Sequence, residues 1–105
     1  MVGAARSYAY DTAGTLWATL EAGDEPSFEQ RAQLVGCFVH TVTTCRSAVQ
    51  LLVDTVGTAA IQNGCPLERQ LRDLNTLVQH VMGQTRMWEW AGGLYFGEDP
   101  PIAVL

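Results

Sequence analysis

Two histidines, His40 and His80, are the side chains of this sequence best suited to exchange a proton near neutral pH. His80 ends a segment in which Arg69, Asp73 and Thr76 recur every three or four residues, so a helix would place these four polar groups on one ridge. Such a ridge is either a solvated face with an Arg69–Asp73 pair, or a surface that faces a ligand or a second subunit. In the second case His80 would act as a general acid or base. His40 lies inside an apolar segment, which favours an interior or interface histidine.

The residue types give little support for other common kinds of catalytic or metal site. The sequence has no lysine, which excludes Schiff-base chemistry and the P-loop lysine. It has no H-E-x-x-H motif and no C-x-x-C pair, so we expect no metal site. A Ser-His-Asp or Cys-His nucleophile stays open, although no nucleophile elbow is present. We expect the three cysteines to be buried, free thiols in a reducing, cytoplasmic environment: Cys37, Cys45 and Cys65.

The net charge of the chain limits the classes of molecule that it is expected to bind. Eleven acidic residues against six arginines give a formal net charge of −5, which argues against a nucleic-acid surface and against binding to an anionic membrane. No apolar run reaches the length of a membrane span, and we expect no cleaved leader. With 105 residues and 48% hydrophobic content, we expect one domain, residues 1–105, built around a single core.

Breaker residues divide the chain into four segments with helical periodicity. Apolar residues recur at helical spacing over about 3–22, 27–62, 66–82 and 84–96. Ser27 and Gln30 form an S-x-x-Q capping box at the start of the second segment, and Pro66 suits the first position of the third. Gly23 and Gly97 are well placed to end the first and fourth segments. The sequence therefore predicts four helices.

Short loops between helices favour antiparallel neighbours. We therefore predict an all-α fold, an antiparallel up-down four-helix bundle. The segment 27–62 is apolar over much of its circumference, which predicts a central position or a subunit interface, and a homo-oligomer such as a dimer or tetramer. Most aromatic side chains should lie in the core or in an interface, and they could also wall a site for a hydrophobic small molecule. They are Tyr8, Tyr10, Trp17, Trp88, Trp90 and Tyr95.

The segment Pro66-Leu67-Glu68-Arg69-Gln70-Leu71-Arg72-Asp73 resembles the P-x-x-R-x-x-R-D segment near the end of acyl-CoA dehydrogenases. Its continuation, residues 74–80, resembles the flavin-dependent monooxygenase branch, whose members carry a comparable R-D-x-x-T/A-x-x-x-H segment. Residues 3–6 and 56–60 also fit the helical domain of that family, so the resemblance spans about residues 2–99. It implies the C-terminal helical domain of the acyl-CoA dehydrogenase superfamily, closest to the two-component monooxygenases.

The resemblance also implies particular site residues. The matching histidine, His80, would lie beside the flavin ring and assist oxygen activation or proton transfer. Arg69 and the turn Gly57-Thr58-Ala59 would approach the phosphate end or adenosine of the flavin (FMN or FAD), often from a neighbouring subunit. The sequence departs from the dehydrogenases here, since it has no Gln-x-x-Gly-Gly and no catalytic glutamate that can be matched.

The N-terminal helical domain and the middle β-domain of that family, which carry much of the flavin and acyl contact surface, have no counterpart in this sequence. We therefore expect a stand-alone or split C-terminal domain of an oxidoreductase that binds flavin only with a flavoprotein partner subunit. Two alternatives stay open. One is a flavin-free dimeric bundle that binds a hydrophobic metabolite, as a cyclase, isomerase or dehydratase. The other is a non-catalytic truncated remnant.

Overall fold

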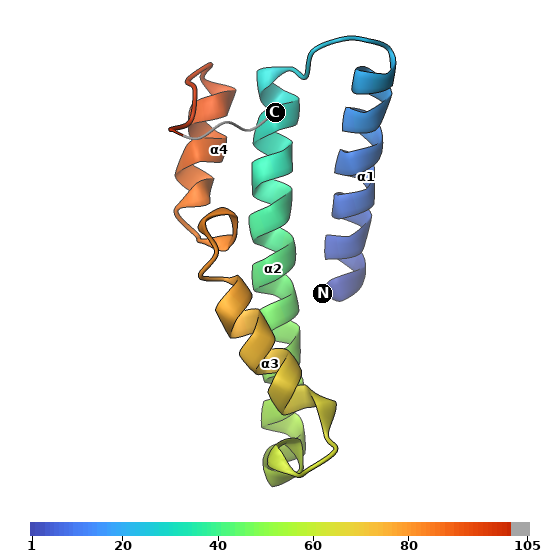
Figure 1. The fold of residues 1–105 in the computed structure, drawn as a ribbon, viewed down its shortest axis with the longest axis vertical. Helices are drawn as coiled ribbons and strands as arrows, with labels where there is room; N and C mark the ends of the chain where they lie inside the picture. Colours follow the sequence, from blue (N-terminus) through green and yellow to red (C-terminus); the bar gives the residue numbers. More distant parts are fainter. Residues whose placement is uncertain (102–105) are drawn as a thin grey trace.

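The structure, a computed structural model, describes residues 1–101, which form helices joined by turns. Two 3-10 helices, η1 (Gly57–Ile61) and η2 (Val81–Gly83), lie between the longer elements. No residue in the range 1–101 is in a strand, so the predicted all-α class is confirmed. In this range no helix combines the length and the hydrophobicity needed to cross a membrane. The α-helices in Figure 1 are α1 (Val2–Glu21), α2 (Phe28–Val56), α3 (Pro66–Leu77) and α4 (Met87–Tyr95).

Local signals set the ends of α1 and the start of α2 as predicted. Gly23 has φ 82°, and its N–H and that of Asp24 bond back to carbonyls of the last turn of α1, which is a Schellman arrangement. The Ser27 hydroxyl accepts from the N–H of Gln30 at 3.1 Å, and the Gln30 side-chain oxygen accepts from the N–H of Ser27 at 3.0 Å. This capping box satisfies two backbone donors that the helix leaves unpaired.

The helix α2 ends at Val56, and not near residue 62 as predicted. Gly57 has φ 61° and ψ −133°, a conformation that an α-helix cannot continue, and the chain then tightens into η1. The apolar pattern runs on through Ala60 and Ile61, which explains the error. Ala60 is buried within η1, whereas Ile61 is exposed. The pattern therefore reflects packing in two different elements.

The helix α3 starts with Pro66 as predicted but ends at Leu77, and not near residue 82. His80 has ψ 140°, which stops the helix, and the chain turns back so closely that a Cβ on Gly83 would lie 2.9 Å from the carbonyl oxygen of Leu77. Real Cβ atoms do not approach a backbone oxygen so closely, so this turn requires glycine at position 83. The last helix begins only at Met87, after this turn, and not near residue 84.

The long helix α2 is central and contacts every other helix, as predicted. Figure 1 shows α1 along one side of α2, while α3 and α4 follow one another along the other side. Direction alternates from α1 to α3, but α4 continues in the direction of α3. The predicted up-down order therefore fails at α4, because residues 78–86 pass through consecutive tight turns without a full reversal.

The main core lies between α2 and α4. Met87, Leu94, Val35 and Val39 are its largest fully buried side chains, and each contributes about 1.5–3 kcal/mol by leaving water. Helix α1 packs on α2 through a narrower buried face, Ala5, Thr12 and Leu16. The turn between α3 and α4 is therefore anchored by a well-packed helix on its C-terminal side. The core cluster consists of Ala32, Val35, Val39, Met87, Ala91 and Leu94.

Candidate functional site

His80 lies in the turn between α3 and α4, and its side chain is exposed. Its Nδ1 accepts a hydrogen bond from the backbone N–H of Met82 at 3.2 Å. Its own N–H donates to the carbonyl of Leu77 at 2.9 Å, and its carbonyl accepts from the N–H of Gly83 at 2.8 Å. Because Nδ1 accepts, the proton of the neutral ring lies on Nε2. The ring faces Phe38 of α2, with centroids 6.5 Å apart. The imidazole is thus held in one position, with Nε2 available for a partner outside residues 1–101.

The polar ridge predicted for residues 69–80 is only partly present. Arg69, Asp73 and Thr76 lie on α3 with exposed side chains, and Arg69 Nε lies 3.8 Å from a carboxylate oxygen of Asp73. The prediction that His80 continues this ridge is wrong, because α3 ends before it. An exposed ion pair of this kind contributes at most about 1 kcal/mol. In this chain Arg69, Asp73 and Thr76 therefore form an exposed helix face, and His80 belongs to the following turn.

Gly57, Thr58 and Ala59, which the resemblance assigns to the flavin, are exposed at the start of η1. Figure 1 places this turn at the end of the molecule, whereas the turn that holds His80 lies about half-way along α2. The 12 residues of α3, about 18 Å of helix, separate the two turns, and Arg69 lies between them. Within one chain, these residues do not form a single compact site.

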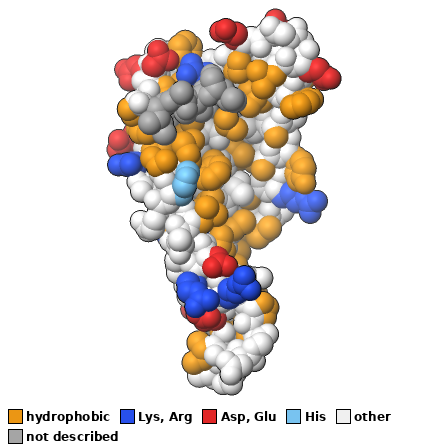
Figure 2. Space-filling view, viewed as in Figure 1, with side chains coloured by type: hydrophobic (Ala, Val, Ile, Leu, Met, Phe, Trp, Pro, Cys, Tyr) orange, Lys and Arg blue, Asp and Glu red, His pale blue; other side chains and the backbone are white. Residues whose placement is uncertain are grey.

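One side of α2 carries an apolar surface beside His80. Phe38, Leu52 and Val56 share this side by their helical spacing, and they are exposed by 38%, 50% and 42%. Figure 2 shows hydrophobic side chains gathered along the middle of the molecule on the face in view. Between Phe38 and Leu52 on this side, Val42 is buried and Cys45 and Val49 are half-buried, so the exposed apolar residues are separated along the helix. The interface predicted for the segment 27–62 stays a prediction.

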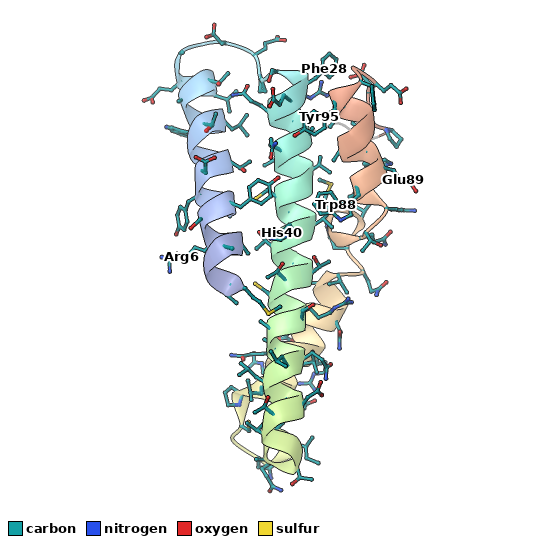
Figure 3. The ribbon with its side chains drawn as sticks, turned by 180° about the vertical axis from the view of Figure 1, so that it is seen from behind. Arg6, Phe28, His40, Trp88, Glu89 and Tyr95 are labelled. Carbon is teal, nitrogen blue, oxygen red and sulfur yellow. The ribbon has the colours of Figure 1, made fainter. Side chains whose placement is uncertain are left out.

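A polar and aromatic bridge, which the sequence did not reveal, joins three helices across another side of α2. The hydroxyl of Tyr8 donates to the side-chain oxygen of Gln33 at 2.7 Å, and the amide of Gln33 donates to the hydroxyl of Tyr95. Trp88 lies over Gly36, where an added Cβ would come within 3.0 Å of the indole ring. Figure 3 shows Trp88 and Tyr95 reaching from α4 toward α2. Gly36, a glycine inside an apolar helix, was the one sequence signal for this close approach.

Tyr8 and the second histidine meet on the α1 side of this bridge. The rings of Tyr8 and His40 have centroids 5.8 Å apart, and both side chains are half-buried. Burial raises the pKa of Tyr8 above its ordinary value, and the neighbouring Cys37 and Tyr95 raise it further. Tyr8 is therefore a neutral hydrogen-bond donor at physiological pH. These contacts give the bridge a structural role between α1, α2 and α4.

The aromatic residues are less buried than predicted. Trp17, Tyr10 and Tyr95 are exposed by 68%, 68% and 52%, so they are not part of the core of this chain. The three cysteines are free thiols, as expected, although Cys45 and Cys65 are only half-buried.

Comparisons with known proteins agree with the resemblance noted in residues 66–80. The family model for the acyl-CoA dehydrogenase C-terminal domain matches residues 1–85. An indole-3-acetate monooxygenase of Acinetobacter baumannii is 28% identical over 102 residues. This match covers 97% of the present chain but only 26% of the relative, so the chain spans about a quarter of that enzyme's length. No solved structure matches the chain. The family model covers well over half of the chain, and the protein therefore belongs to the acyl-CoA dehydrogenase family, with the sequence of its C-terminal domain.

Proposed function

We propose that this chain is the C-terminal helical domain of a flavin-dependent oxidoreductase of the monooxygenase type, and that it presents His80 to an active site completed by other protein. The observation that carries this proposal is the fixed, exposed imidazole of His80 in the turn after α3. The family membership and the monooxygenase relative support it. The remaining three quarters of that relative's length indicate how much additional protein would complete such an active site.

The residues around His80 fit one edge of a flavin site. Phe38 offers an apolar surface against which the imidazole ring packs, and Nε2 can donate a proton or a hydrogen bond to an oxygen atom. A bound flavin, FMN or FAD, would supply the electrons for oxygen chemistry. His80 is exposed, so the walls that exclude water from such a site must come from another protein segment or subunit.

The second proposed flavin contact lies on a different part of the surface. Arg69 and the turn Gly57-Thr58-Ala59 are separated from His80 by the length of α3. We assign them to the phosphate end of a flavin held by a neighbouring subunit. This assignment accounts for their exposure on this chain and requires an assembly, either a homo-oligomer or a complex with a flavoprotein partner in the cytoplasm.

The apolar side of α2 is the surface through which we expect this assembly to form. Phe38, Leu52 and Val56 are exposed on α2, and Figure 1 shows α1 along one side of this helix and α3 and α4 along the other. A helix from a second copy or from a flavoprotein partner would cover this side and complete an antiparallel four-helix bundle. Burial of a large apolar side chain contributes about 1.5–3 kcal/mol, so a handful of such contacts favours stable association.

A chimera tests the proposed role of His80. The matching quarter of the A. baumannii monooxygenase is replaced by this chain, and flavin absorbance and substrate turnover are measured. We expect the chimera to retain flavin, and we expect His80→Ala to lower kcat by about 100-fold or more with flavin still bound, because acid–base groups contribute effects of this size. His40→Ala is the matched control, since His40 is half-buried against Tyr8, and it should leave kcat nearly unchanged. Equal turnover of His80→Ala and the parent chimera would remove His80 from the mechanism.

A further inference from the structure

An open hollow of about 350 Å³ lies where α2 meets the segment that joins α3 to α4. Its volume is at the lower end of the range for small-molecule sites, so it suits a small ligand or one group of a larger one. Residues from α2 and from the segment 78–86 contribute to it, and none of them carries a carboxylate. They are Thr43, Arg46, Val78, Gln79, Gly83, Gln84, Thr85 and Arg86.

The two arginines of this hollow differ from the other arginines of the chain. Among residues 1–101, neither Arg46 nor Arg86 is in an ion pair, although the protein carries a net charge of −5. The others have partners: Arg31 pairs with Asp99, Arg69 with Asp73 and Arg72 with Glu68, and Arg6 lies over the ring of Tyr10. The two guanidinium groups without a carboxylate partner therefore line the same hollow.

The residues that line this hollow carry positive charge and no negative charge. Two acidic residues lie near it: Asp54 lines a neighbouring hollow together with Arg46 and accepts a hydrogen bond from Gln50 at 2.8 Å, and Glu89 lies in the first turn of α4. The hydroxyl of Thr85 can donate to a ligand, and Arg86 is the N-cap residue of α4 and makes no side-chain capping bond. The first backbone N–H groups of α4 are already bonded to carbonyls of residues 84–86, so the donor set for an anion consists of two guanidinium groups and a hydroxyl.

We propose that this hollow binds a small oxyanion, a phosphate or a carboxylate group, between Arg46 and Arg86. A guanidinium group presents paired N–H donors that match the oxygens of both groups. The side chain of Arg46 is half-buried on the rigid helix α2, and Gln84, whose amide donates to the carbonyl of Gln79 at 2.9 Å, braces the opposite wall. This site involves neither His80 nor the flavin contacts, so it stands independently of the proposed function.

Calorimetric titration of the purified full chain tests this site. Inorganic phosphate and acetate are titrated separately, at an ionic strength held constant with chloride. We expect saturable binding of one of the two anions, and the anion that binds more tightly identifies the chemical group. Arg46→Gln and Arg86→Gln should each weaken that binding about tenfold or more, since a charge-assisted hydrogen bond is lost.

Arg6→Gln is the matched control, because it removes the same charge from the far side of α1, where Figure 3 shows Arg6 pointing away from α2. It should change the affinity by less than about twofold, because surface charges at this range are screened. Arg86 is exposed, so Arg86→Gln keeps the test valid even where Arg46→Gln disturbs packing. Absence of saturable binding of both anions, an unchanged affinity in Arg86→Gln, or an equal loss in Arg6→Gln would each overturn the proposal.

Discussion

The close packing of the turn after α3 predicts that a larger residue at Gly83 lowers the stability of the protein. A Cβ at this position would lie 2.9 Å from the carbonyl oxygen of Leu77 and 3.4 Å from the Cα of Val78. Both neighbours are backbone atoms, which cannot rotate away as a side chain would. Gly83→Ala should therefore strain the turn by about 1–3 kcal/mol, the usual cost of forcing one extra methyl group into a packed site. For a domain of this size, such a loss lowers Tm by roughly 4–20 °C.

Thermal unfolding followed by circular dichroism measures this effect, and Gly92→Ala is a control with the opposite sign. Gly92 lies inside α4, where an added Cβ meets no atom within 4 Å. The same glycine-to-alanine change there should raise stability by about 0.5–1 kcal/mol through helix propensity. If Gly83→Ala were as stable as the parent chain, the close approach of the turn to the end of α3 would be refuted. The explanation for the early end of α3 would then fail with it.

Three further perturbations test the packing and the bridge. Met87→Ala removes a fully buried side chain between α2 and α4 and should cost about 2–5 kcal/mol in urea unfolding, whereas a cost below 1 kcal/mol would show that α4 is loosely docked. Ser27→Ala removes the capping box of α2 and should cost about 1 kcal/mol by the same measurement, with Ser7→Ala, on the exposed face of α1, as a near-neutral control. The raised pKa of Tyr8 means that the folded chain holds this proton more tightly than the unfolded chain, so stability is retained below about pH 10 and falls as pH rises through the raised pKa. Tyr8→Phe should therefore show a smaller drop in Tm at alkaline pH, and an identical drop would place the alkaline loss elsewhere.

The parts of the fold that sequence reasoning predicted depend on interactions a few residues apart. The capping box of Ser27 and Gln30, the first-turn Pro66 and the left-handed Gly23 each act within one helical turn of their own position. Their effects can therefore be predicted from the residue types alone. The same holds for the apolar spacing of α2, which placed it at the centre of the molecule.

The parts that failed depend on contacts between segments. The periodicity of residues 67–81 fits one helix, but the approach of Gly83 to Leu77 ends that helix early. As a result, His80 changes from a helix-face residue to a turn residue whose Nδ1 is engaged by the N–H of Met82. No local signal distinguishes a glycine that interrupts a helix from one that packs under its end. The position of a candidate catalytic side chain was therefore less predictable than the helix that precedes it.

The common location of Arg46 and Arg86 in one hollow also could not be predicted from the sequence. The two residues lie on different helical segments, and each reads in the sequence as an ordinary surface charge. Their common hollow exists because the segment 78–86, which joins α3 to α4, lies beside the middle of the long helix. The same segment carries the chain from α3 into α4 without the reversal that an up-down bundle requires. The departure from the predicted topology and the candidate oxyanion site therefore both depend on residues 78–86, whose path is set by contacts between segments.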